Sequence, residues 1–236
     1  GHSFAVAISA HTGIGTLPIL YYGTEEQKQK YLPKLASGEW KAAYCLTEPD
    51  SGSDANAAKS KAKLTDDGKH YVINGQKWYT SSGDGAEFAI VMAVTNPEAG
   101  PYLQASMIIV PTDTPGFNLV RNIPVMGHAG EDYFSHAEIL YQNCRVPQNN
   151  LLGPEGHGFV IAQERLGPGR IHHCMRWIGI CNRAFDLMCA RAQERTIAPN
   201  RRLASKQIVQ AWIAESAAEI LAARLMVLNA AWKIEQ

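Results

Sequence analysis

The spacing of apolar residues changes twice along this chain, and this feature limits its fold more than any other. Residues 4–38 follow a helical period, and residues 42–147 form short β-rich runs separated by turn residues. After Gly153 the helical period returns. Because each pattern must bury its apolar face in its own way, this order of helix, sheet and helix predicts an α+β fold.

The predicted fold has three parts. A partial N-terminal helical domain covers residues 1–41, an antiparallel, β-barrel-like middle domain covers residues 42–150, and the first helices of an incomplete C-terminal four-helix bundle cover residues 151–236. Gly1-His2-Ser3 leads directly into an apolar segment, and the last helical pattern still continues at Gln236. We therefore expect the chain to be truncated at both ends.

The helix before the sheet has a clear start and end. Thr24-Glu25-Glu26-Gln27 has the pattern of a capping box, in which the Thr24 hydroxyl and the Gln27 amide bond each other's backbone. Gly38 is typical of a helix C-terminus. Pro33 lies between them and predicts a kink or a weakened turn.

Turn signals divide the middle of the chain into strands. Asp67-Gly68 and Asn74-Gly75 are hairpin-turn dipeptides on either side of the run 70–73. Further strands are predicted at 89–94, 106–110 and 139–146, with a turn at 111–116. Short strands without intervening helices favour an antiparallel sheet or barrel.

Two long helices are predicted after the sheet. Apolar residues recur at steps of three and four from Ile213 to Trp232, and a second helix is predicted over residues 171–195. Pro199 and Asn200 separate the two helices, and glycines at 153, 156 and 158 indicate a turn that leads into the first. The helices are expected to pair antiparallel, as half of a bundle.

Composition excludes several classes of protein. Lys+Arg and Asp+Glu number 22 each, so the formal net charge is zero, which argues against a nucleic acid or an anionic membrane as the main partner. The five cysteines include no CxxC pair, so neither a disulfide framework nor a zinc site is indicated. No apolar run approaches the ~18 residues of a membrane span. We therefore expect no membrane insertion and no metal.

The segment from Cys45 to Ala57, CLTEPDSGSDANA, is the strongest candidate for a functional site. It places hydroxyls, glycine and carboxylates in a tight loop at the edge of the predicted sheet. Such a loop can present backbone N–H groups and hydroxyls to a flavin or a pyrophosphate. The alternative is a polar turn closed by side-chain hydrogen bonds. No GxGxxG or GxxxxGK[ST] motif offers another nucleotide site.

The pattern Cys45-Leu46-Thr47-Glu48-x-x-Ser51-Gly52-Ser53-Asp54-x-x-Ala57 resembles the first signature of the acyl-CoA dehydrogenase family, a family of flavoproteins. Further segments are similar to this family in the same order along the chain. They are 23–28, 31–33, 74–77, 126–127, 145–147, 164–166, 169–170 and 194–195. The resemblance covers essentially the whole chain and implies FAD as the cofactor.

The resemblance assigns the signature residues to a flavin and a thioester. It implies that Tyr44 and Leu46 lie against the flavin ring and that the Thr47 hydroxyl bonds near the flavin N5 edge. A donor there would stabilise the negative charge that develops as hydride arrives. Gly52 and Ser53 correspond to positions at the FAD pyrophosphate and the CoA thioester arm.

Five residues outside the signature receive roles from the same resemblance. Tyr79 and Ser81 stand where the family usually has tryptophan and threonine against the flavin, and they keep a flat ring and a hydroxyl. Arg170 matches an arginine that supports the active site and binds substrate on the CoA side. Arg195, and with it Gln207, match residues that reach the FAD of a neighbouring subunit. The resemblance therefore implies a homodimer or homotetramer.

The implied reaction is removal of a proton α to the thioester carbonyl, with hydride transfer from the β-carbon to the flavin. This reaction needs a carboxylate base. In most of the family the base is a glutamate that would lie beyond Gln236, and in one branch it stands at the position of Gly169, which cannot serve. We therefore expect the catalytic base outside these residues and the chain alone to be inactive.

The leading functional hypothesis is an acyl-CoA dehydrogenase of fatty-acid β-oxidation that passes electrons to an electron-transfer flavoprotein. An acyl-CoA oxidase or a nitroalkane oxidase-like flavoenzyme is an alternative that differs in what reoxidises the flavin. A non-catalytic scaffold derived from the family is a third hypothesis. The resemblance is compatible with a bacterial cytoplasm or a mitochondrial matrix.

Overall fold

A computed structural model describes residues 2–236 of the chain, with side chains at 2, 3, 5 and 6 left out of the description. It divides into two compact units. One is Ile8–Leu166, and the other is Gly167–Gln236 together with the chain's start up to Ala7. Two helices, α1 (His2–Ala10) and α4 (Gly158–Glu194), pass from one unit into the other.

The sheet unit begins with helical segments. A π-helical turn, His11–Thr16, follows α1, and α2 (Leu17–Tyr22) and α3 (Glu25–Ser37) come next. The predicted capping box is confirmed, because the Gln27 N–H donates to Thr24 Oγ1 at 3.2 Å and the Thr24 N–H donates to Gln27 Oε1 at 3.1 Å. Helix α3 ends at Gly38, which has a φ of +75°. Pro33 lies inside this helix.

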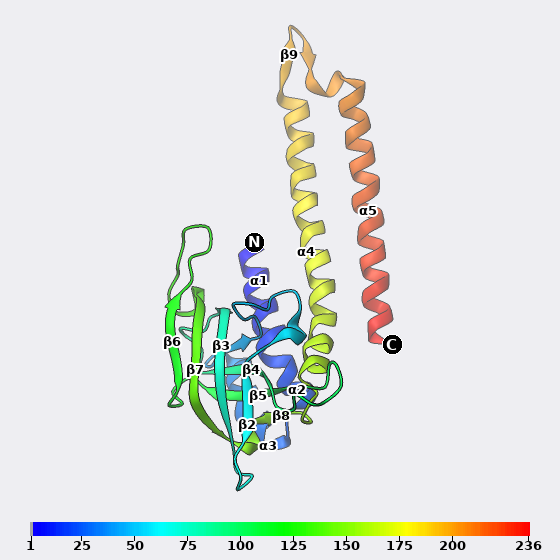
Figure 1. The fold of residues 1–236 in the computed structure, drawn as a ribbon. Helices are drawn as coiled ribbons and strands as arrows, with labels where there is room; N and C mark the ends of the chain where they lie inside the picture. The colour runs from blue at the N-terminus through cyan, green and yellow to red at the C-terminus, as the bar shows by residue number, and fades with distance from the viewer. Residues whose placement is uncertain (1) are drawn as a thin grey trace. The chain divides into compact units, whose positions relative to one another are not determined.

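Eight strands form one sheet (Figure 1). Their bounds are β1 Ala42–Cys45, β2 Lys61–Leu64, β3 His70–Ser81, β4 Phe88–Val94, β5 Ala105–Pro111, β6 Phe117–Asn122, β7 His136–Pro147 and β8 Leu151–Leu152. The strand order is β6-β7-β3-β2-β4-β5-β8, and β1 pairs with β4 beside this path. The strands at 89–94, 106–110 and 139–146 are confirmed within β4, β5 and β7.

The prediction of an antiparallel, barrel-like sheet is wrong in two respects. The sheet does not close, because β6 and β8 stand at its two ends and do not pair with each other. It is also mixed, because β1 and β2 both run parallel to β4. Four of the six β6 side chains are exposed, as expected at an open edge.

One of the two predicted hairpin turns is a real turn and the other is not. Asp67-Gly68 joins β2 to β3, with Gly68 at a φ of +67°. At Asn74-Gly75, strand β3 continues, and only its register against β7 shifts. Gly75 has a φ of +151°, and a Cβ there would overlap the Ser60 side chain. This glycine therefore allows close packing within a strand rather than a reversal of the chain.

The core of the sheet unit lies on both faces of β4. Ala89, Val91 and Ala93 belong to one buried cluster, whereas Phe88 and its alternating neighbours Ile90 and Met92 belong to another. The second cluster includes residues of α2, α3 and the first turn of α4, so these helices cover that face. Strand β4 is therefore a central strand buried on both sides.

The helical unit contains most of α4 and all of α5 (Gln207–Glu235), joined by a small hairpin of β9 (Thr196–Ala198) and β10 (Arg201–Arg202). The predicted turn before α4 is confirmed, with Gly153 and Gly156 at positive φ. Pro168 and Ile171 of α4 line one hollow with Ala231 and Ile234 of α5. The start of α4 within this unit thus adjoins the end of α5, which confirms the antiparallel pairing (Figure 1).

Within residues 2–236, no helix is both long and apolar enough to span a bilayer. No cluster of His, Cys, Asp or Glu side chains in the same range is arranged to hold a metal ion.

Candidate functional site: a loop closed by a buried ion pair

The segment Leu46–Ser60, here called the signature loop, leaves one line of the sheet and returns to it. Cys45 at the end of β1 pairs with Val91, and Lys61 at the start of β2 pairs with Val94. Both pairings lie on the same edge of β4, because β5 occupies the other edge. On β4, only Met92 and Ala93 separate the partner of Cys45 from the partner of Lys61. The whole loop therefore projects from this short gap.

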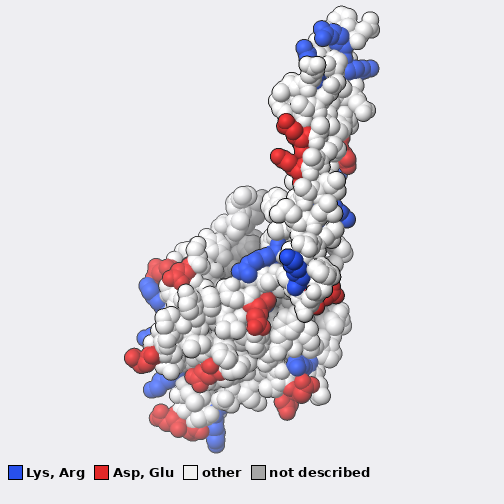
Figure 2. Space-filling model, turned by 90° about the vertical axis from the view of Figure 1, so that its right-hand side faces the viewer, with Lys and Arg blue, Asp and Glu red and all other residues white. Residues whose placement is uncertain are grey.

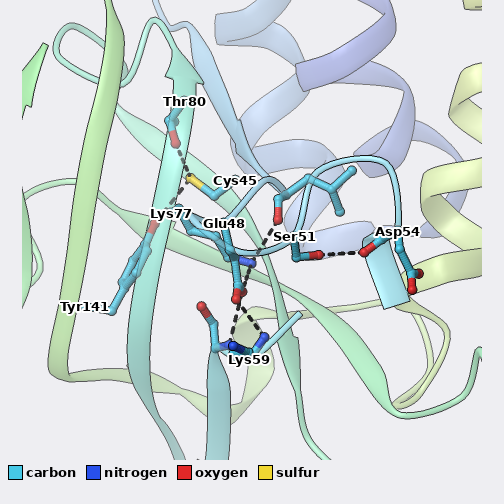
Figure 3. A network of polar contacts seen from close by, with 10 residues as sticks. Cys45, Glu48, Ser51, Asp54, Lys59, Lys77, Thr80 and Tyr141 are labelled. Atoms are coloured by element: carbon cyan, nitrogen blue, oxygen red, sulfur yellow. Dashed lines mark hydrogen bonds and ion pairs between the residues drawn. The ribbon is translucent and has the colours of Figure 1, made fainter. Parts of the chain in front are cut away.

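The base of the signature loop is closed by a buried carboxylate. The Glu48 side chain is 5% exposed and accepts hydrogen bonds from the backbone N–H of Lys59 at 2.6 Å and of Ser60 at 3.0 Å (Figure 3). These bonds join the third residue of the loop to its last two. The loop is thus fastened at its base.

The partner of Glu48 is Lys77 of β3, whose side chain is completely buried. Lys77 Nζ donates to Glu48 Oε1 at 2.7 Å and to the Leu46 carbonyl at 3.2 Å. Burial opposes the charge on Glu48, but Lys77 and the backbone donors hold the pKa of Glu48 below its usual value. Burial lowers the pKa of Lys77, and Glu48 offsets part of that effect.

Short-range hydrogen bonds shape the outer part of the loop. Glu48 and Ser51 exchange two backbone hydrogen bonds, and Ser51 Oγ donates to the Asp54 carbonyl at 2.5 Å. The Asp54 carboxylate accepts from the Asn56 N–H at 3.1 Å, a contact that braces the loop. Between these contacts, Gly52 and Ser53 are exposed at the tip of the loop.

Strand β3 carries a bulge beside the signature loop. Lys77 pairs with Ile139 and Thr80 with Ala137, so three steps along β3 face two steps along β7. Tyr79 in the bulge has a φ of +52° and is 48% exposed, while Thr80 is buried. The bulge therefore turns the Tyr79 ring outward. Ser81 is exposed too, and its hydroxyl is 2.9 Å from His136 Nδ1.

Two alternate residues of β3 bind two alternate residues around the end of β1. The Trp78 N–H donates to the Thr47 carbonyl at 2.8 Å, and Thr80 Oγ1 donates to Cys45 Sγ at 3.6 Å. The structure thus brings the predicted residues of β1 and the loop next to those of β3. The Thr47 side chain is half-buried, and within residues 2–236 its hydroxyl makes no hydrogen bond.

Tyr44 and Leu46 pack toward the helices. Both join the cluster that α2, α3 and α4 cover, and the Tyr44 hydroxyl donates to Met107 Sδ at 3.6 Å. The Arg165 guanidinium of α4 lies 4.2 Å from the centre of the Tyr44 ring. Burial raises the pKa of Tyr44, and Arg165 offsets part of this rise.

The remaining predicted residues lie in the helical unit, and all three are exposed. Arg170 is on α4, Arg195 follows its last residue, and Gln207 is the first residue of α5. The Leu203 N–H donates to the Arg195 carbonyl at 2.8 Å across the β9–β10 hairpin. Basic side chains gather at this hairpin end, whereas both signs of charge are interspersed on the rest of the visible face (Figure 2).

One hollow of the sheet unit lies away from the predicted site residues. It has a volume of about 470 Å³ and lies beside the β2–β3 hairpin. It is lined by Lys63, Leu64, Thr65, Asp66, Val72, Asn74 and Asn143, none of which was a predicted site residue.

Sequence reasoning missed three charged residues that shape the site: Glu48 and Lys77 as a buried pair, and Arg165 over Tyr44. A signal for Lys77 existed, because it stands at an inward position of the alternating strand 70–81. No local pattern indicated that Glu48 would be its partner, because only strand pairing in the sheet brings β3 next to the loop.

The comparisons with known proteins agree on one family. Models described as the N-terminal, middle and C-terminal domains of acyl-CoA dehydrogenase match residues 1–39, 43–144 and 156–236. A probable acyl-CoA dehydrogenase, FadE2, of Mycobacterium tuberculosis is 47% identical over 94% of this chain and 54% of its own length.

Two solved structures show the same likeness. An acyl-CoA dehydrogenase from Geobacillus kaustophilus has a TM-score of 0.82 and 37% identity, with 94% of this chain and 57% of that chain covered. A chain from a structure described as the electron transferring flavoprotein of Acidaminococcus fermentans has a TM-score of 0.83 and 35% identity, with 98% and 59% covered. This chain thus spans little more than half the length of these relatives. It belongs to the acyl-CoA dehydrogenase family.

Proposed function

We propose that this chain is part of an enzyme that carries out FAD-dependent α,β-dehydrogenation of an acyl-CoA thioester and passes the electrons to an electron-transfer flavoprotein. The observation that carries the proposal is the meeting of the Thr47 segment with the β3 bulge at Tyr79. Family membership supports the reaction type, and one structural relative bears the name of the proposed electron acceptor.

The residues present fit a flavin. Thr47 offers a half-buried hydroxyl with no hydrogen-bond partner within residues 2–236, and Tyr79 offers an outward aromatic ring nearby. At Gly52, an added Cβ would meet no atom within 4 Å, so the tip of the loop is open to a large ligand. A hydroxyl donor, a flat ring and an open glycine tip suit the polar edge, ring and pyrophosphate of FAD.

Each residue has a distinct part in the proposed reaction. FAD, when bound, supplies the hydride acceptor. Thr47 donates a hydrogen bond toward the polar edge of the cofactor, where negative charge develops. Tyr44, Leu46, Tyr79 and Ser81 contact the flavin in this proposal, and Gly52 admits its pyrophosphate. Ser53 orients the thioester arm.

Three exposed residues of the helical unit also have parts in this proposal. Arg170 supports the substrate on the CoA side, and Arg195 and Gln207 reach the FAD of a second copy, so the proposed assembly is a homodimer or homotetramer. We propose that the assembly acts in fatty-acid β-oxidation, in a bacterial cytoplasm or a mitochondrial matrix.

The proposed base for the α-proton does not come from these residues. Gly169 has no carboxylate. Glu164 acts on Tyr22: burial, together with Glu164, raises the pKa of Tyr22 to about 12. We therefore take the base from another part of the natural protein and expect the 236 residues alone not to turn over.

The test uses the natural protein that contains these residues. The purified protein should be yellow, or should become so when FAD is added, and an acyl-CoA should bleach the flavin under anaerobic conditions. An electron-transfer flavoprotein should then restore the oxidised spectrum faster than oxygen does. Faster reaction with oxygen would indicate an oxidase. A preparation that takes up no FAD would rule out the proposal.

A further inference from the structure

We propose that the buried Glu48–Lys77 ion pair is a positioning device that closes the base of the signature loop and thereby sets where Thr47 and Ser53 lie. This inference rests on the function proposed above, in which Thr47 serves the flavin and Ser53 the thioester. Neither Glu48 nor Lys77 is proposed to touch a reacting atom. Their effect is exerted through the loop they hold.

The sheet by itself does not hold the whole signature loop. Its ends leave and re-enter the sheet across a gap of two β4 residues, Met92 and Ala93. Ladder hydrogen bonds fix the chain up to Cys45 and again from Ser60, whose carbonyl accepts from the Val94 N–H at 2.8 Å. Between these points the loop needs other contacts to hold a single conformation.

The ion pair provides these contacts at both ends of the loop. Lys77 Nζ binds the Leu46 carbonyl and Glu48 Oε1, at the start of the loop. The Glu48 carboxylate binds the N–H groups of Lys59 and Ser60, at its end (Figure 3). One carboxylate and one ammonium group therefore connect four residues of the loop with β3.

The ion pair lies next to residues that are proposed to contact the flavin. Lys77 binds Leu46 and Glu48, the residues immediately before and after Thr47. It therefore holds the chain on both sides of Thr47. Lys77 also stands at the first residue of the β3 bulge that turns Tyr79 outward. The same ammonium group therefore ties together the two elements that carry the proposed flavin contacts.

Burial of the ion pair has an energetic cost. A completely buried lysine and a 5% exposed glutamate lose most of their hydration, and apolar residues of similar size often replace such pairs without loss of stability. What distinguishes this pair is the set of backbone groups that it binds. An apolar pair would leave the N–H groups of Lys59 and Ser60 and the Leu46 carbonyl without these partners.

The test compares Lys77→Met with Lys59→Met in the natural full-length protein. Lys59 pairs with Asp50 at 2.8 Å in the same loop, but both side chains are about 70% exposed, so this control removes a surface ion pair and keeps the Lys59 backbone N–H. With FAD saturating, kcat/KM for an acyl-CoA per bound flavin should fall at least about tenfold in Lys77→Met. It should stay within about twofold in Lys59→Met.

A merely structural role would give a different result. Lys77→Met would then lower the melting temperature and the amount of folded protein, but turnover per bound flavin would be unchanged, which would overturn the inference. The exchanged pair Glu48→Lys with Lys77→Glu provides a further check. It restores opposite charges, but a lysine cannot accept from the two N–H groups. Recovery of turnover in this double variant would also overturn the inference.

Amide hydrogen exchange of the wild-type protein tests the closed base even if the variants do not fold. The Lys59 and Ser60 amides should exchange much more slowly than those of Gly52 and Ser53. Equal rates would contradict the inference. Wild-type protein without flavin uptake would reject the proposed function itself, whereas normal wild-type turnover with an unaffected Lys77→Met would reject only the positioning role.

Discussion

The two units of this chain bury their apolar side chains to very different extents. In the sheet unit, Ile90 and Ile108 are completely buried, whereas Trp177, Trp212 and Trp232 of the helical unit are each more than half exposed. This difference in burial decides for which predicted site residues the structure shows the surroundings. Seven of the ten predicted site residues lie in the sheet unit, where its own packing determines their surroundings, and the other three lie on exposed helical surface.

Core substitution should separate the two units most strongly. In the 236-residue chain, Ile90→Ala should lower the free energy of unfolding by about 2–5 kcal/mol, because it leaves a cavity in a strand buried on both faces. Leu225→Ala, at a side chain that is 57% exposed, should change it by no more than about 0.5 kcal/mol. Urea unfolding measures both. A large loss for Leu225→Ala would mean that α5 is covered by other protein.

The hydroxyl at Thr47 should matter for turnover rather than for stability. Thr47→Val should reduce kcat of the natural protein about 10- to 100-fold, because a donor to developing charge is lost. Thr80→Val is the matched control, since Thr80 faces the core and donates only to Cys45 Sγ. Its kcat should change by less than about threefold. Equal effects of the two substitutions would mean that Thr47 has no special position.

Substitution by alanine should have different effects at two glycines of the sheet unit. Gly75→Ala should destabilise the fold by about 1–3 kcal/mol, because its Cβ would overlap Ser60 and its φ is positive. Gly52→Ala should leave stability nearly unchanged, because its Cβ would enter open space, and should weaken FAD binding instead. Thermal unfolding and FAD titration of both variants check this. A stable Gly75→Ala would contradict the close packing of β3 on Ser60.

Acid should weaken the sheet unit through Glu48. Since the pKa of Glu48 is lowered in the folded state, its ionised form stabilises the fold above the usual glutamate value of about 4.5. That contribution is lost as the pH falls through the lowered value. Glu48→Gln should therefore be less stable than wild type at pH 7, and the difference should shrink below about pH 4. Urea midpoints across this range measure the effect, and a constant difference would contradict it.

Predictions from the sequence succeeded where a few neighbouring residues decide the outcome. The capping box at Thr24, the turn at Asp67-Gly68 and the turn before α4 depend on local hydrogen bonds and backbone preferences. Asn74-Gly75 has the same local signal as a turn, but β7 and Ser60 hold it within a strand. Local preference was overridden there by pairing with a distant strand.

The sequence by itself determined the family, the order of helix, sheet and helix, and the segment that carries the candidate site. It did so because these features are encoded in residue type and spacing along the chain. Only the tertiary structure decided that the sheet is open and mixed and that Glu48 meets Lys77, 29 positions away. These outcomes depend on strand pairing between distant segments. The residues of the signature loop can be recognised from the sequence, but their arrangement depends on β3, which closes the base of the loop.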